Sequence, residues 1–227
     1  MIQQLLDYAL KEKNKPRKRS GLFSPSMLGR CYRAQIWNRM NIEQTEPPDE
    51  RTFRVFEVGH IFHNFIQDLL LKQNPEFQKE VMIKTEHFCG FADLVEPDEV
   101  TDIKSMHSRG FFYLNADTIT KEKKPAIMQV LWYAKELKKK QGRIVFVSKD
   151  DLCIAEYVFP LNEFWSKALA NEEKTLIEAW EKALKGVLPP AKPRAFVNKQ
   201  GLSAECSKYC SWKSVCQKIE KERGEVK

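Results

Sequence analysis

The sequence predicts an α/β fold in which a mixed sheet is flanked by helices. Three short alternating or apolar segments, typical of strands, follow one another in the middle of the chain. A further pair is typical of a hairpin, and segments with helical apolar periodicity lie before and after the three strands. The expected strands are residues 79–85, 89–95, 99–106, 143–147 and 153–159.

Two helices are expected before the strands. The first covers residues 24–40, because Ser24 is a favourable N-cap residue and Pro25 suits the first helical position. A polar linker at 43–50 separates it from an apolar-periodic helix at 53–71.

The region after the strands is expected to contain two more helices. Residues 108–124 show no clear period and are expected to be irregular, overhanging the functional site. A helix should begin at Pro125, and a long amphipathic helix at 162–185 should end near Gly186.

The length of 227 residues suits one domain covering residues 1–227. With 42% hydrophobic and 30% charged residues, the chain is expected to be globular. No apolar run approaches the roughly 20 residues of a membrane span. Asp7 interrupts the N-terminal apolar stretch, and basic residues follow that stretch, which is contrary to a signal peptide. We therefore expect a cytoplasmic protein with no membrane partner.

The charge of the chain favours a polyanionic partner. The net charge is +7 and the pI is about 9.0. Each basic run alone is also typical of a solvated face, so the runs support nucleic-acid binding only together. They are residues 11–19, 121–124, 138–143 and 192–199.

Two aspartates are predicted to face each other on neighbouring strands. If Pro97 and Asp98 form a two-residue turn, an antiparallel count places Asp93 directly opposite Asp102, with Cβ atoms ~5 Å apart. Lys104 projects from the same face as Asp102. Two like charges in that position are destabilising, so a cation between them is a natural explanation.

An acidic residue and a lysine on one strand face are common on solvated surfaces, so the strand pattern alone does not predict a metal site. Residues on two expected helices strengthen the prediction. Gly59 and His63 share one face of their expected helix, and Gln129 and Tyr133 share one face of theirs. Although a single histidine is more often a core residue than a ligand, this ordered series is harder to explain by packing alone.

The series resembles the PD-(D/E)XK nuclease superfamily, in its RecB-like branch, which includes CRISPR adaptation exonucleases, AddB-type nuclease domains and phage recombination nucleases. Asp102 stands where glutamate is frequent in that branch. The residues that carry the resemblance are Gly59, His63, Gly90, Phe91, Ala92, Asp93, Asp102, Ile103, Lys104, Gln129 and Tyr133.

The resemblance implies a restriction-endonuclease-like core at about 53–160 and specific roles. The ligands of a divalent metal would be His63, Asp93, Asp102 and the backbone carbonyl of Ile103. The catalytic residues would be Asp93, Asp102, Lys104, Gln129 and Tyr133, with Lys104 acting on the attacking water and the last two supporting the lysine and the DNA phosphate.

The residue types agree with phosphodiester hydrolysis. Hard oxygen ligands suit Mg²⁺ or Mn²⁺, and one histidine among carboxylates tilts the preference toward Mn²⁺. Lys104 is suited either to accept a proton or to act as an electrostatic clamp. The sequence leaves both roles open.

Four of the six cysteines suit a soft metal centre. Cys206, Cys210 and Cys216 crowd the C-terminal segment 186–220, and Cys31 lies in the N-terminal segment 20–45. The resemblance implies an iron–sulfur cluster, with 4Fe–4S favoured over 2Fe–2S, that joins the two segments; a structural zinc is the alternative. The two remaining thiols, Cys89 and Cys153, lie in strand-like segments and are expected to be inert core thiols.

The function expected from this sequence is a metal-dependent DNA nuclease. We expect an exonuclease on single-stranded DNA or DNA ends, in recombination, repair or phage DNA processing. A CRISPR spacer-adaptation nuclease would share all these residues, and either enzyme could work with recombination or CRISPR adaptation proteins. A non-catalytic nucleic-acid-binding or scaffold protein with structural zinc is the alternative from another class.

Overall fold

The computed structural model describes residues 1–15, 20–191 and 205–222, and the chain divides into two compact units. The sheet unit comprises residues 24–29 and 55–175. The cysteine unit comprises residues 1–23, 30–54 and 176–227.

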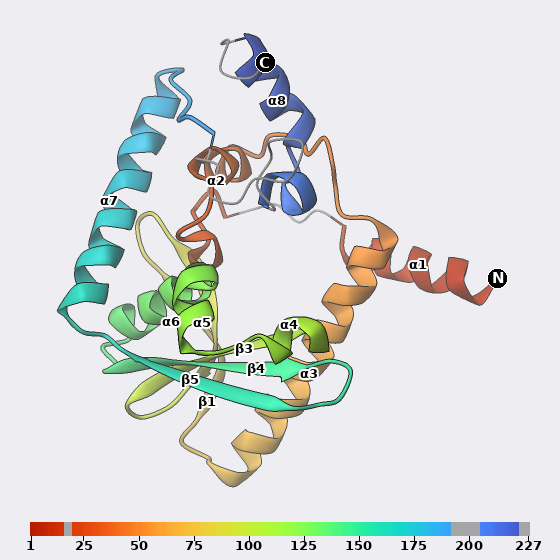
Figure 1. The fold of residues 1–227 in the computed structure, drawn as a ribbon, viewed down its shortest axis with the longest axis vertical. Helices are drawn as coiled ribbons and strands as arrows, with labels where there is room; N and C mark the ends of the chain where they lie inside the picture. The colour runs from red at the N-terminus through yellow and green to blue at the C-terminus, as the bar shows by residue number, and fades with distance from the viewer. Residues whose placement is uncertain (16–19, 192–204, 223–227) are drawn as a thin grey trace. The chain divides into compact units, whose positions relative to one another are not determined.

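The sheet unit is built on a five-stranded mixed sheet in the order β1-β2-β3-β4-β5 (Figure 1). Only the β3–β4 pair is parallel, and the other three pairs are antiparallel. The predicted mixed sheet is therefore confirmed. The strands are β1 (Gln78–Lys84), β2 (Cys89–Val95), β3 (Glu99–Met106), β4 (Gln141–Ser148) and β5 (Ile154–Pro160).

Helices pack on both faces of this sheet. On one face, Phe62 and Ile66 of α3 (Glu50–Gln73) lie against the buried side chains Ile103, Val145 and Val147. The opposite face carries α6 (Lys124–Glu136), and α7 (Glu163–Leu184) follows β5.

Gly142 permits the close packing of α6 on β4. A Cβ atom at Gly142 would lie 2.7 Å from Cγ1 of Val130 on α6, so a larger residue would push the helix away. The helix side chains beneath it, including Ile127, Val130 and Leu131, are fully buried. This close packing holds Gln129 of α6 in place near Lys104 and Asp102 of β3.

The predicted helix over residues 24–40 is wrong. A short 3₁₀ turn, η1 (Pro25–Met27), is followed by Gly29 at φ +73°, and α2 (Tyr32–Arg39) begins only after Cys31. A Cβ at Gly29 would sit 3.1 Å from the Met128 sulfur, and its positive φ cannot continue a helix. The Ser24 hydroxyl bonds the Ser26 hydroxyl and caps no backbone group.

Residues 108–124 are helical where the sequence indicated an irregular segment. They form α4 (Ser108–Phe112) and α5 (Ala116–Glu122). Asn115 and Thr118 exchange side-chain and backbone hydrogen bonds in a capping box at the start of α5. The third helical position of this capping box is a threonine, where glutamate or glutamine is usual, so the sequence pattern did not predict the helix.

The cysteine unit is helical and contains elements that the sequence did not predict. They are α1 (Ile2–Lys13), a π-helical turn at Glu205–Tyr209 and α8 (Lys213–Glu222). The unit also contains α2, which lies within the predicted helix at 24–40. Trp37 and Trp212 pack with ring centroids 6.1 Å apart, and Trp212 donates its indole N–H to the carbonyl of Glu43. Across the described ranges, no helix is both long and apolar enough to cross a membrane.

Candidate active site

The two aspartates come together where the β2–β3 ladder ends. The Glu96 N–H donates to the Glu99 carbonyl at 2.9 Å, which closes the predicted two-residue turn. Pairing continues to Leu94 opposite Thr101. The next pair in this register would be Asp93 and Asp102, so the predicted register is confirmed up to the acidic residues.

Asp93 lies in an environment that disfavours its own charge. Its Oδ2 accepts the backbone N–H of Ile103 at 2.7 Å and lies 3.5 Å from Nδ1 of His63. Burial raises the pKa of Asp93 to about 7, and the nearby Asp102 carboxylate adds to the increase. A bound cation would reverse this effect by favouring the carboxylate.

Asp102 presents one bonded and one unbonded oxygen. Its side chain is only 2% exposed, and Oδ1 accepts from Nζ of Lys104 at 2.8 Å. The same Nζ lies 3.2 Å from Oε1 of Gln129 on α6. Oδ2 of Asp102 is buried without a hydrogen-bond partner among the described residues. A buried carboxylate oxygen without a partner is costly unless an ion occupies its lone pairs.

His63 is presented in the form that binds metals. Burial lowers the pKa of His63, and the Lys104 cation lowers it further. The imidazole is therefore neutral near pH 7 and keeps a lone pair for a ligand. Gly59, one turn earlier, faces Ser105 with ordinary contact distance for a Cβ, so packing does not require glycine there.

Tyr133 is a buried support for Gln129. Its ring is 3% exposed, and its hydroxyl is hydrogen-bonded with the Gln129 side chain and the backbone of Phe91. Burial raises the Tyr133 pKa, with the Asp102 and Asp93 carboxylates contributing, so the phenol stays protonated. A Cβ at Gly90 would lie 2.5 Å from this hydroxyl, which explains the glycine.

Sequence reasoning missed two residues of this neighbourhood, Glu80 and Gln67. Ligand atoms of His63, Glu80 and Asp93 all lie within 4.8 Å of one another. The buried Gln67 donates Nε2 to Oε1 of Glu80 at 3.0 Å and to the Asp93 carbonyl at 2.6 Å. Gln67 follows His63 by one helical turn, so the spacing rule that found Tyr133 could have found it. Nothing in the sequence singles out Glu80.

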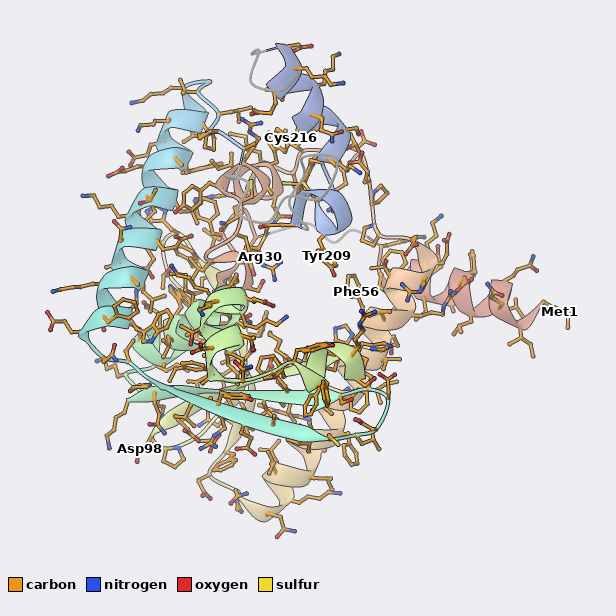
Figure 2. All side chains as sticks on the ribbon, viewed as in Figure 1. Met1, Arg30, Phe56, Asp98, Tyr209 and Cys216 are labelled. Carbon is orange, nitrogen blue, oxygen red and sulfur yellow. The ribbon has the colours of Figure 1, made fainter. Side chains whose placement is uncertain are left out.

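The four cysteines predicted to bind a metal all belong to the cysteine unit. Burial raises the pKa of Cys210 to about 11, with Cys31, Cys206 and Cys216 as further causes, so the four thiols share one neighbourhood. Cys216 lies on α8 (Figure 2) and accepts a hydrogen bond from Nη1 of Arg33 at 3.2 Å.

The other two cysteines were expected to be buried in strands. Cys89 is half-buried in β2, whereas Cys153 is exposed and precedes β5. The prediction of a core thiol is therefore wrong for Cys153. None of the six cysteines forms a disulfide.

The predicted basic runs differ in how they are arranged. Lys121 pairs with Asp117 and Lys140 with Asp98, as is usual on solvated faces. The run at 192–199 and residues 16–19 of the run at 11–19 lie outside the described residues.

Three solved structures share the fold. SSO0001 is 20% identical, with 95% of this chain and 96% of that chain covered and a TM-score of 0.58. The alkaline exonuclease LHK-Exo of Laribacter hongkongensis is 12% identical over 74% of this chain and 92% of its own, with a TM-score of 0.54. Its complex with dAMP is 14% identical over 73% and 91%, also with a TM-score of 0.54.

The likeness to LHK-Exo shows that the mixed α/β fold is similar to that of an exonuclease. No protein-family model and no curated protein matches the chain.

Proposed function

We propose that this protein is a metal-dependent DNA nuclease, an exonuclease acting on single-stranded DNA or DNA ends. The observation that carries the proposal is the buried Oδ2 of Asp102, which has no hydrogen-bond partner within the described part of the chain and lies near Lys104 and Asp93. The exonuclease fold of LHK-Exo, which has been solved with dAMP, supports a nucleotide substrate.

The donor set fits Mg²⁺ or Mn²⁺. His63, Asp93, Asp102 and the carbonyl of Ile103 would hold the ion, and three of these four ligands are oxygen donors. When bound, the ion would neutralise charge on phosphate oxygens and make water more acidic.

The side chains around the ion position would orient the reaction. Lys104 is held between Oδ1 of Asp102 and Oε1 of Gln129, two acceptors that keep its ammonium directed at the site. From there it can stabilise negative charge on the phosphate as the P–O bond to the leaving oxygen breaks. Tyr133 holds Gln129 in place through its hydroxyl.

We also propose that Cys31, Cys206, Cys210 and Cys216 hold an iron–sulfur cluster, with 4Fe–4S as the favoured type. The shared neighbourhood of the four thiols supports it. Burial raises the pKa of Cys216, and the Arg33 guanidinium that donates to its sulfur acts in the opposite direction. A structural zinc with the same four ligands is the alternative.

The nuclease would act in DNA recombination, repair or phage DNA processing, or alternatively in CRISPR spacer adaptation. The identity of the neighbouring genes would distinguish these roles. A non-catalytic nucleic-acid-binding protein would need none of the buried polar arrangement at Asp93, Asp102 and Lys104. That arrangement therefore favours the enzyme.

The decisive experiment uses end-labelled single-stranded, duplex and circular DNA with Mg²⁺, Mn²⁺ or a chelator. We expect the linear substrates to be shortened from their ends in either metal, single strands fastest, and to be intact with chelator. Cleavage of closed circles at the same rate would contradict an exonuclease. Cleavage that persists in chelator would contradict metal dependence.

A further inference from the structure

We propose that Glu80 is a metal ligand, and that it forms with His63 and Asp93 a second divalent-cation position beside the one completed by Asp102. This inference rests on the proposed nuclease function and deepens it, because two ions would then flank the scissile phosphate.

The backbone of β1 turns the Glu80 side chain toward the site. Glu80 has φ +51°, the left-handed conformation that non-glycine residues seldom adopt. It falls between the regular pairs Lys79↔Leu94 and Val81↔Ala92, at the position opposite Asp93 where no regular pair forms. The irregularity thus lies beside the proposed Asp93 ligand.

Gln67 fixes Glu80 and Asp93 relative to each other. It is fully buried on α3, one turn after His63, and its single amide nitrogen donates to both the Glu80 carboxylate and the Asp93 carbonyl. Its own Oε1 has no partner among the described residues. Groups of this kind, which orient ligands without binding metal themselves, accompany most protein metal sites.

The ligand atoms favour two positions. Opposite ligands of an octahedral Mg²⁺ lie about 4.2 Å apart, twice a bond of 2.0–2.1 Å. The ligand atoms of His63, Glu80 and Asp93 lie within 4.8 Å of one another, so the three side chains would have to close by at most about 0.6 Å to bind one ion. Asp102 is not part of this group. Asp102 instead offers its buried, unbonded Oδ2. With both ions bound, His63 would give its single lone pair to the ion held with Glu80. Asp93 would be shared between that ion and the one held by Asp102 and the Ile103 carbonyl.

The chemistry of a second ion follows from its place. Two ions a few ångströms apart can stabilise the attacking and the leaving oxygen of one phosphodiester at the same time. Glu80 is exposed, so its position is open to an incoming phosphate and water.

The test is Mn²⁺ binding to the intact protein, measured by calorimetry and by electron paramagnetic resonance without DNA. We expect the wild type to bind two ions with a spin-coupled signal. Glu80→Gln should bind one ion, or bind the second about tenfold or more weakly, with the coupled signal lost. Glu86→Gln, which removes an equal charge from a side chain that is 87% exposed, should behave as the wild type.

A second variant, Glu80→Asn, guards against misfolding, because asparagine tolerates positive φ better than most residues. It should keep the wild-type circular dichroism and bind one ion. Two coupled ions in both Glu80 variants would overturn the inference, as would a single ion in the wild type. A wild type that binds no Mn²⁺ and cleaves no DNA would refute the proposed function itself.

Discussion

Replacing Asp93 with asparagine should have opposite effects on stability with and without metal. The Asp93 side chain is 12% exposed, and its pKa is raised to about 7 by burial and by the nearby Asp102 carboxylate. The amide can still accept the Ile103 N–H while removing the charge. Without metal, Asp93→Asn should therefore be more stable than the wild type above neutral pH.

The magnitude follows from the pKa of Asp93. A rise from 3.8 to about 7 corresponds to about 4 kcal/mol in the free energy of unfolding. Part of that rise belongs to the pair rather than to Asp93 alone, and facing like charges on strands are worth up to ~1 kcal/mol. We expect a gain of about 1–3 kcal/mol.

The sign of the pH dependence is fixed by the direction of the shift. The folded-state pKa of Asp93 lies above its unfolded value, so the wild type is favoured when this group is protonated and loses stability as pH rises toward 7. The advantage of Asp93→Asn should be full at pH 8 and absent near pH 4.

Saturating Mn²⁺ should reverse the order. The wild type gains about 4.1 kcal/mol at a metal concentration of 1,000 Kd, which exceeds the variant's expected advantage, and the variant gains little. Urea titrations at pH 8, with chelator or with Mn²⁺, measure both differences. If Asp93→Asn were less stable than the wild type in chelator, the proposed repulsion between buried carboxylates would be wrong.

Three further predictions concern other parts of the molecule. Tyr133→Phe should slow DNA cleavage while circular dichroism stays unchanged, because Gln129 loses a hydrogen bond worth about 0.5–1.5 kcal/mol; unchanged cleavage would remove its positioning role. Glu220→Leu should lower the free energy of unfolding by about 3–5 kcal/mol in urea titrations, because it leaves the charge of the fully buried Arg33 without its ion-pair partner. Adding Arg33→Met should recover most of that loss, and additive losses would contradict the ion pair. Cys206→Ser should lose iron and acid-labile sulfide where Cys153→Ser keeps both, and stoichiometric zinc without sulfide would replace the cluster.

Much of the sheet could be predicted from the sequence because its signals are local. The predicted strands 89–95 and 99–106 coincide with β2 and β3, since side-chain alternation and a proline turn determine them. The register counted from that turn was sufficient to predict that Asp93 and Asp102 lie close together. Helical spacing likewise placed Gln129 and Tyr133 on one face of α6.

The failures depend on contacts distant in sequence. Gly29 breaks the expected helix because it packs against Met128, about 100 residues later. Glu80 reaches the site only through a left-handed backbone opposite Asp93 and a hydrogen bond from Gln67, none of which has a sequence pattern. The helices around the cysteines are short, and their shared neighbourhood is a tertiary property.

The most direct measurement compares single-strand cleavage in Mn²⁺ by Asp102→Asn and by Asp98→Asn. Both variants remove one aspartate charge, but Asp102 is buried beside Lys104 and Asp98 is 70% exposed in the turn. We predict that Asp102→Asn loses cleavage by at least about a hundredfold while remaining folded, on the scale of removing one transition-state contact, and that Asp98→Asn cleaves as the wild type. Wild-type cleavage by a folded Asp102→Asn protein would contradict the proposed active site.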